Sequence, residues 1–282
     1  MPYRIGIDIG GTKVLGVILN NGKILRKKKI QISRKNPSDF MDSVDKLIDY
    51  LLDGKPSMGS AIGLAFPGDI EKGKLLKAPN LHYLEGFDFS GFLRGQKFKK
   101  ISFANDDACF ALGEAIRLNR KNLVGITIGT GFGSGVVVGG KIYCGQSNSV
   151  ELGHTIVRPG GRLCHCKNRG CLEEYISTRA LLRETKKVFG KEVDAYELNV
   201  LSRKGNKKAT EVCKTLGFYL GIGLGNISNI LNPEVISVGG GLAKNRLIVK
   251  YGIEEMRKIL YSHEPKVVFG KYESNAIGAA SL

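Results

Sequence analysis

The sequence predicts an α/β fold built from two related halves. A buried strand, a glycine-rich turn and a second strand follow one another near the start of the chain and again near its middle. Segments with helical periodicity separate the remaining predicted strands, and 282 residues suffice to bury one large core or two smaller ones. We expect an N-terminal lobe at residues 1–115, to which a final helix at 275–282 returns, and a C-terminal lobe at residues 116–274.

The first glycine turn follows a buried strand predicted at residues 4–9 and leads into a second strand at residues 14–19. Its glycines let the backbone approach a bulky anion, and the next two residues add a hydroxyl donor and a positive charge. These turn residues are Gly10, Gly11, Thr12 and Lys13. Asp8, at the strand end, can hold a hydrated magnesium ion. No helix follows, so the turn is not a Walker A motif, and taken alone it also fits an ordinary glycine hairpin.

The second glycine turn repeats this pattern. A strand predicted at residues 123–128 precedes the turn at residues 129–131, and a further strand is predicted at residues 136–138. A third glycine turn, at residues 239–241, follows a strand predicted at residues 235–238. Two matching turns on related lobes suit a nucleotide held between them.

Between the first two turns, a short strand ends at Asn105 and Asp106, where a helix begins. The dipole and the free N–H groups at a helix N-terminus favour the ionised form of a carboxylate there. The ordinary alternative is a helix N-cap, for which both residue types are common. Further helices are expected at residues 38–52, 178–189, 194–202 and 208–231. We expect the glycines of the last of these helices to allow close packing against the sheet.

A short polar segment between Glu151 and Glu173 gathers side chains that bind metals. Its spacing suits a tetrahedral zinc ion held by His154, Cys164, Cys166 and Cys171. His165 competes with His154 for the imidazole position, and spacing alone does not exclude it. A disulfide or a set of free thiols is the alternative. A metal that folds a loop bracketed by two carboxylates indicates a built site.

The motifs of the chain stand in a definite order. They are Asp8-x-Gly10-Gly11-Thr12-Lys13, Asn105-Asp106, Ala111-Leu112-Gly113-Glu114, Gly129-Thr130-Gly131-x-Gly133, Glu151-x-Gly153-His154, Cys164-x-Cys166-x(4)-Cys171-Leu172-Glu173 and Asn275-Ala276-Ile277-Gly278-Ala279-Ala280. This order resembles that of the ROK family of sugar kinases over nearly the whole chain, and the motifs are most similar to those of bacterial ATP-dependent glucokinases. The resemblance implies the actin-like (ribonuclease H-like) two-lobed ATPase fold with a zinc-binding loop.

The resemblance also implies a role for each motif. Asp106 would act as general base on the 6-hydroxyl of a sugar. The sugar pocket would include Asn80, Asn105, Asp106, Glu151, His154 and Glu173. Structural zinc would be held by His154, Cys164, Cys166 and Cys171. The phosphates and magnesium of ATP would lie along Asp8, Gly10, Gly11, Thr12, Lys13, Thr130 and Gly131, with Gly240 and Gly241 against the adenosine.

The implied activity is transfer of the γ-phosphoryl group from Mg-ATP to the 6-hydroxyl of a hexose, with glucose as the first candidate. Kinases of the same family for N-acetylmannosamine, N-acetylglucosamine, fructose or allose are alternatives that the pocket residues do not separate. A non-enzymatic sugar sensor or regulator is a further alternative, which Asp106 and the two glycine turns disfavour. One departure from the family pattern is Asp107, an extra carboxylate beside the expected base.

The formal net charge of +17 comes with lysine-rich runs at residues 26–29, 97–100 and 203–208. Solvated faces are the plain interpretation, and steering of ATP, polyphosphate as donor or nucleic-acid binding are functional alternatives. Nothing resembles a helix-turn-helix, so we do not expect nucleic-acid binding. No apolar run reaches about 18 residues, so we expect no membrane span, and the first strand leaves no room for a signal peptide. Free thiols beside a zinc cluster fit a reducing cytoplasm, where we expect a homodimer or homotetramer.

Overall fold

The computed structural model describes residues 3–33, 36–78, 81–146 and 150–282. Asn80, which we expected in the sugar pocket, lies outside these residues. The chain divides into two compact units. Unit 1 comprises Met1–Lys121, Gly135–Val150 and Lys271–Leu282, and unit 2 comprises Asn122–Ser134 and Glu151–Gly270.

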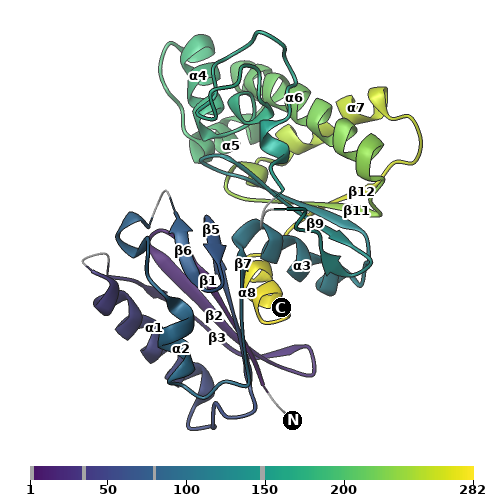
Figure 1. Cartoon of the computed structure of the whole chain (residues 1–282). Coiled ribbons are helices and arrows are strands. Elements are labelled where there is room, and N and C mark those ends of the chain that lie inside the picture. Colours follow the sequence, from purple (N-terminus) through teal and green to yellow (C-terminus); the bar gives the residue numbers. More distant parts are fainter. Residues whose placement is uncertain (1–2, 34–35, 79–80, 147–149) are drawn as a thin grey trace. The chain divides into compact units, whose positions relative to one another are not determined.

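Unit 1 is built on a five-stranded sheet with the strand order β3-β2-β1-β4-β7 (Figure 1). Its strands are β1 (Arg4–Ile9), β2 (Lys13–Asn20), β3 (Lys23–Gln31), β4 (Ala61–Phe66) and β7 (Lys100–Asn105). The first three strands pair antiparallel, and β4 pairs parallel with both β1 and β7. Because β1, β4 and β7 run in the same direction, their carboxyl ends meet at one edge of the sheet. This edge therefore receives both Asp8 and Asn105.

Helices cover the two faces of this sheet (Figure 1). On one face lies α1 (Pro37–Leu52), whose buried leucines would touch a Cβ added at Gly16 of β2. The other face receives α8 (Ser274–Ala279), where a Cβ at Gly6 or Gly63 would lie 1.8 Å from a backbone oxygen of the helix. Glycines in β1 and β4 thus let the backbone of α8 lie directly on the sheet. This helix ends at Ala279, earlier than the range 275–282 that we predicted.

The other elements of unit 1 are short, apart from α3. The hairpin of β5 (Asp69–Glu71) and β6 (Lys74–Lys77) precedes α2 (Phe89–Arg94), and α3 (Asp106–Leu118) follows β7. Aromatic rings fill the core beside the hairpin: Phe89 packs edge-to-face on Phe66 with ring centroids 4.6 Å apart.

The second five-stranded sheet has the order β10-β9-β8-β11-β12. Its strands are β8 (Leu123–Ile128), β9 (Phe132–Val138), β10 (Lys141–Ile142), β11 (Val235–Gly239) and β12 (Lys266–Phe269). Numbered along the chain, the strands of each sheet stand in the same order, 3-2-1-4-5, which confirms the two related halves. β9 begins at Phe132, so the prediction of a strand confined to residues 136–138 was too short. Its early glycines lie inside the strand, and a Cβ at Gly135 would fall 2.3 Å from the backbone oxygen of Asp107.

The helices of unit 2 are α4 (Thr178–Phe189), α5 (Ala195–Arg203), α6 (Lys207–Leu231) and α7 (Arg246–Ile259). The expectation that the glycines of α6 face the sheet is wrong, because three of the four face α7 and Gly223 faces Leu172. A Cβ at Gly217 would lie 2.5 Å from Cβ of Tyr251, and one at Gly225 would lie 2.3 Å from Cδ1 of Ile259. Glycines at a spacing of four residues therefore let two helix backbones approach each other. Within the part of the chain that the structure describes, no helix is long and apolar enough to span a membrane.

Candidate active site and metal centre

The strand ends of unit 1 carry a cluster of carboxyl groups. Asp8 lies near the end of β1, and Asp106 is the first residue of α3. Oδ1 of Asn105 accepts hydrogen bonds from two backbone N–H groups of the first helical turn, at 2.9 and 3.2 Å. The N-cap that we considered as an alternative is therefore present, and it is Asn105. Asp106 is left in the first turn of the helix, beside Asp107.

Burial and mutual repulsion raise the pKa of these carboxyl groups. Burial raises the pKa of Asp8 from 3.8 to about 7; the charge of Lys29 opposes this shift, Asp107 adds to it, and a hydrogen bond with Asn275 lowers it. The pKa of Asp106 is raised well above its ordinary value, first by burial and then by the charges of Asp107 and Asp8. The expectation that the helix N-terminus keeps Asp106 ionised is therefore wrong for the net shift. Backbone hydrogen bonds do lower this pKa, but burial outweighs them.

The helix α8 completes this cluster. Nδ2 of Asn275 donates to the backbone oxygen of Asp106 at 3.3 Å. The start of α8 is held by Glu114 of α3, a fully buried side chain that accepts hydrogen bonds from the backbone of Lys271 at 3.0 Å and from the hydroxyl of Ser274. We inferred no individual role for Asn275 from the sequence, because its motif does not tell which residue of the helix faces Asp8.

The first glycine turn is tight. The backbone N–H of Gly10 donates to the backbone oxygen of Lys13 at 3.0 Å, and a Cβ at Gly10 would lie 3.0 Å from that same oxygen. Gly11 is half-buried, whereas Thr12 and Lys13 are exposed. Because the turn follows β1 directly, these polar groups lie at the same sheet edge as Asp8.

The second glycine turn, in unit 2, is held by the start of α4. The backbone N–H of Gly129 donates to the oxygen of Gly131 at 3.0 Å and closes the turn. Thr178 donates to the oxygen of Gly129 twice, from its backbone at 2.7 Å and from its hydroxyl at 2.8 Å. Thr130, between the two glycines, is exposed.

The third glycine turn has a packing reason of its own. Gly240 has a φ of +90°, and a Cβ there would lie 2.3 Å from the backbone oxygen of Ile128. Gly240 is therefore required by the end of β8, with or without a ligand. Gly241 has open space around its Cα and is exposed.

The four predicted metal ligands converge in unit 2. The ligand atoms of His154, Cys164, Cys166 and Cys171 all lie within 4.8 Å of one another. Sγ of Cys164 is 3.6 Å from Nδ1 of His154, and Sγ of Cys166 is 3.5 Å from Sγ of Cys171. A tetrahedral zinc ion, with bonds of about 2.3 Å to sulfur and about 2.0 Å to nitrogen, fits between atoms at such distances. The cysteines form no disulfide, so the three thiols of the cluster are free.

Local turns bring these ligands together. The backbone N–H of Cys164 donates to the oxygen of Asn168 at 2.8 Å, and Lys167 donates back to the oxygen of Cys164 at 2.9 Å. Gly170 has a φ of +92°, and a Cβ there would lie 1.9 Å from the backbone oxygen of Arg158. The polar, glycine-containing segment between the second and third cysteines therefore has to fold back on the chain.

The two histidines have different surroundings. His154 directs Nδ1 toward Cys164, while its Nε2 lies 4.0 Å from Oε2 of Glu151. Nδ1 of His165 lies 3.7 Å from Sγ of Cys164 and 3.2 Å from Oε1 of Glu173, with which it forms a second potential metal-binding group. The group with three thiols suits zinc better, so His154 is the imidazole that fits the metal centre.

Glu173 contacts the second glycine turn. Its Oε2 accepts a hydrogen bond from the backbone of Phe132 at 2.9 Å, and a Cβ at Gly131 would lie 2.5 Å from this oxygen. Its Oε1 accepts from Arg179 at 2.8 Å. We did not predict Arg179 or Thr178, because no spacing in the sequence indicates that α4 begins beside this carboxylate.

The predicted residues thus form two sets. The set in unit 1 consists of Asp8, Gly10, Gly11, Thr12, Lys13, Asn105 and Asp106. The set in unit 2 consists of Thr130, Gly131, Glu151, His154, Cys164, Cys166, Cys171, Glu173, Gly240 and Gly241.

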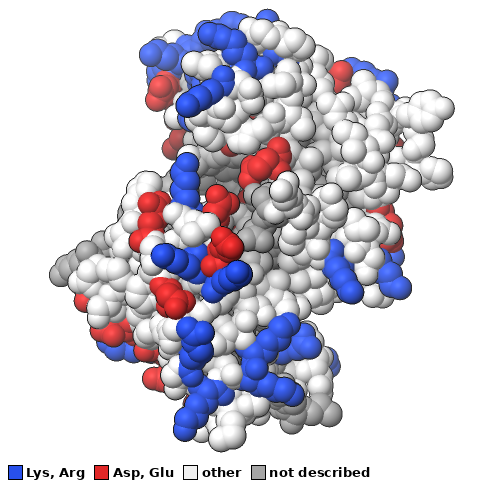
Figure 2. Space-filling view, in the orientation of Figure 1, with Lys and Arg blue, Asp and Glu red and all other residues white. Residues whose placement is uncertain are grey.

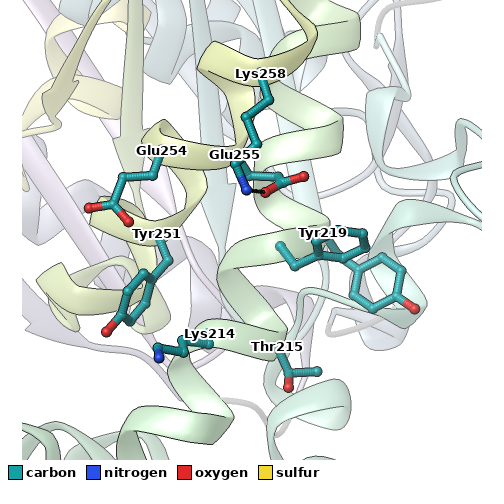
Figure 3. Close-up of a pocket in the computed structure, with 8 residues that line it drawn as sticks. Lys214, Thr215, Tyr219, Tyr251, Glu254, Glu255 and Lys258 are labelled. Atoms are coloured by element: carbon teal, nitrogen blue, oxygen red, sulfur yellow. Dashed lines mark hydrogen bonds and ion pairs between the residues drawn. The ribbon is translucent and has the colours of Figure 1, made fainter.

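A separate open groove of about 650 Å³ lies between α6 and α7 (Figure 3). Its charged side chains have partners: Nζ of Lys258 is 2.6 Å from Glu255, and Lys214 lies over the ring of Tyr251, 5.8 Å from its centroid. None of the predicted site residues lines this groove.

Lysine and arginine side chains lie in several groups on the face shown in Figure 2, with acidic side chains among them. The run on β3 has partners on both sides of the sheet. Lys28 lies over the ring of Tyr50 at 4.1 Å, and Lys29 lies over that of Tyr272 at 4.4 Å. Lys27 forms an ion pair with Glu273.

Comparisons with known proteins agree with this geometry. A family model described as "ROK family" matches residues 4–282. A glucokinase from Thermotoga maritima is 29% identical, covering 99% of this chain and 96% of its own length. An N-acetyl-D-glucosamine kinase from Photobacterium profundum is 28% identical, covering 95% of this chain and 94% of its own length.

A solved structure of a related protein is also similar to this chain. The ROK family glucokinase from Streptomyces griseus, crystallised with glucose and AMPPNP, is 25% identical and superposes with a TM-score of 0.77 over 99% of this chain and 98% of that one. The fold is therefore the actin-like ATPase fold. With a family model that matches almost every residue, the chain belongs to the ROK family.

Proposed function

We propose that this chain is an ATP-dependent hexokinase that transfers the γ-phosphoryl group of Mg-ATP to the 6-hydroxyl of a hexose, with glucose as the preferred sugar. The chain is a sugar kinase of the ROK family. Glucose is favoured because the relative from Thermotoga maritima is named a glucokinase and the structure from Streptomyces griseus holds glucose.

The observation that carries the proposal is the position of Asp106. Its carboxyl group stands in the first turn of α3, at a sheet edge that also carries a glycine turn, and its pKa is raised by burial and by Asp107 and Asp8. Asp106 would accept the proton of the sugar hydroxyl as that oxygen attacks the γ-phosphorus. Beyond accepting this proton, the protein has little covalent chemistry to do, because positioning and charge neutralisation dominate the catalysis of phosphoryl transfer.

The donor would be held by the glycine turns. Asp8, Thr12 and Lys13 would contact magnesium and the phosphates, and the second turn would contact the phosphates through Thr130 and Gly131. Bound magnesium would neutralise charge on the phosphoryl oxygens. The tight turn supports this role, because the hydrogen bond from Gly10 to Lys13 closes it directly after β1, where Thr12 and Lys13 are exposed.

The sugar would be oriented by Asn105, Glu151, His154 and Glu173. We propose that the metal centre is structural zinc. Coordination through Nδ1 of His154 would leave Nε2, which lies 4.0 Å from Glu151, for a sugar hydroxyl. The amide nitrogen of Asn105 is left for the sugar while its oxygen caps α3.

A coupled assay of ADP formation by the purified chain tests this proposal. Glucose, fructose, allose, N-acetylglucosamine and N-acetylmannosamine are compared at several concentrations with Mg-ATP. We expect the highest kcat/KM for glucose. A higher value for N-acetylglucosamine would replace glucose with the sugar of the Photobacterium profundum relative. No turnover with any of these sugars would contradict a kinase and favour a sugar-binding regulator.

The same purified chain tests the remaining expectations. We propose ATP as the donor, and substitution of polyphosphate for ATP in the assay should abolish turnover. We also propose a homodimer or homotetramer in the cytoplasm, and light scattering measures the mass of the assembly in solution.

A further inference from the structure

One carboxylate of unit 2 joins two segments to which the proposed function assigns different substrates. The side chain of Glu173 is only 8% exposed. Its Oε2 bonds the backbone N–H of Phe132, which ends the second glycine turn, at 2.9 Å. Its Oε1 faces the other way, toward His165 at 3.2 Å and Arg179 at 2.8 Å. The proposed donor turn and the proposed sugar carboxylate are therefore in direct contact.

The same stretch of chain holds the other end of the turn. Thr178, five residues after Glu173, bonds the oxygen of Gly129 through both its backbone and its hydroxyl. The segment between Glu173 and Thr178 is buried apart from Thr178 itself, which is half-buried. Gly131 lies so close to Glu173 that even a Cβ would not fit. Glu173 therefore contacts the turn at both Gly131 and Phe132.

Two side chains, Arg179 and His165, contact Oε1 of Glu173. A single terminal nitrogen of Arg179 contacts Oε1 of Glu173 at 2.8 Å and Oε1 of Glu174 at 3.1 Å. Arg183, one helical turn further along α4, contacts the carboxylate and the backbone oxygen of Glu174 at 2.9 and 2.6 Å. The two arginines are equally exposed, at 44% and 41% of the side chain. They differ in that Arg179 reaches Glu173.

We propose that Arg179 is a positioning residue that holds Glu173 against the second glycine turn, and that through this contact donor binding and sugar binding strengthen each other. The inference rests on the proposed function, which assigns the turn to the donor and Glu173 to the sugar. A donor phosphate that orders the turn also fixes Phe132, and with it the carboxylate that meets the sugar. Coupling of this kind is reciprocal, because each ligand biases the same element.

Calorimetric titration of the purified chain tests this inference. The sugar that the assay identifies is titrated with and without saturating Mg-AMPPNP. We expect the nucleotide to tighten sugar binding about fivefold or more in the wild-type chain. Arg179→Met should lose most of this gain, whereas the matched control Arg183→Met should keep it. Arg179→Lys should restore part of it, because one nitrogen makes both contacts.

Several outcomes would overturn the inference. It is wrong if the wild-type chain binds sugar equally well with and without the nucleotide, or if R183M loses the gain as R179M does. If R179M does not unfold cooperatively on heating, Arg179→Gln takes its place, and a full gain in that variant would also refute the proposal. An inactive wild-type chain would instead contradict the proposed function, so the two failures are distinct.

Discussion

At the scale of single residues, three neighbouring carboxyl groups of unit 1 affect one another. Asp8 and Asp106 both have raised pKa values, and Asp107 contributes to each. Asp107 is the extra carboxyl group beside the expected base, and its charge raises the pKa of that base. Lys29 and Asn275 lower the pKa of Asp8, which burial raises. The resulting pKa of about 7 keeps this carboxyl group close to ionisation at neutral pH.

Asp106→Asn should remove most turnover while sugar binding persists. The amide keeps the size of the side chain but cannot take up a proton, and loss of a general base costs about 10²–10⁴-fold in rate. The kcat of the purified variant and its sugar affinity by calorimetry give the result. A variant that keeps more than about a tenth of the wild-type kcat would show that another group removes the proton.

Asp107→Asn should shift the pH dependence without destroying activity. Removing this charge lowers the pKa of Asp106, and since the base acts in its ionised form, the acid limb of the kcat/KM profile should move to lower pH. Because the folded-state pKa of Asp106 is raised, protonated Asp106 contributes stability that is fully present below its unfolded pKa of about 3.8. That contribution is lost as pH rises through the folded-state pKa. The variant should lessen that loss in thermal unfolding. An acid limb that stays in place or moves upward would contradict the assignment.

At the scale of elements, one loop of unit 2 carries the candidate metal ligands together with carboxylates that we propose to meet the sugar. Four ligands from three short turns converge within 4.8 Å, and the same loop carries Glu151 near Nε2 of His154. Backbone hydrogen bonds, the ion pair of Arg162 with Glu184 and the close packing of Gly153, Gly161 and Gly170 also hold the loop. A bound metal would add to this stability.

Cys166→Ser should lose the zinc and weaken sugar binding more than donor binding. Elemental analysis should find one zinc per wild-type chain and none in the variant, while the KM for sugar rises about tenfold or more. The donor KM should change less, because Thr178 still holds the second glycine turn. Cys144→Ser, at an exposed thiol outside the cluster, is the control and should keep its zinc. Full zinc content in C166S would refute the ligand assignment.

Elements with a clear local sequence pattern were predictable from the sequence. The buried strands β1, β8 and β11 are apolar runs ended by glycine, and the metal ligands lie close together in the chain. The start of β9 was missed because Gly133 and Gly135 resemble turn residues, although both lie inside the strand and close packing against Asp107 needs a glycine at Gly135. The contacts of Asn275 and Arg179 depend on which side of a helix docks on which neighbour. Local pattern does not contain that information.

At the scale of the whole molecule, the net charge of +17 has two possible origins. Either the charged side chains only solvate the surface, or their electric field attracts polyanionic ATP. The run on β3 can separate the two, because neighbouring residues of a strand face opposite sides of the sheet. Lys29 stands in register with Leu15, and Leu15 with Asp8, so that Lys29 lies on the side of the candidate site. Lys28 lies on the other side, over Tyr50 of α1.

The kcat/KM for ATP should fall as salt rises, because exposed charges are screened over about 8 Å at physiological ionic strength, whereas the KM for sugar should barely move. If the field of the whole molecule attracts ATP, Lys28→Gln and Lys29→Gln should reduce the salt dependence equally, since each removes one charge. If the effect is local, only K29Q should reduce it, and the pKa of Asp8 should rise in the same variant because the charge that lowers it is gone. Steady-state kinetics from low to high salt distinguish these outcomes. A salt response that is flat in the wild-type chain would leave the positive charge as a property of the solvated surface.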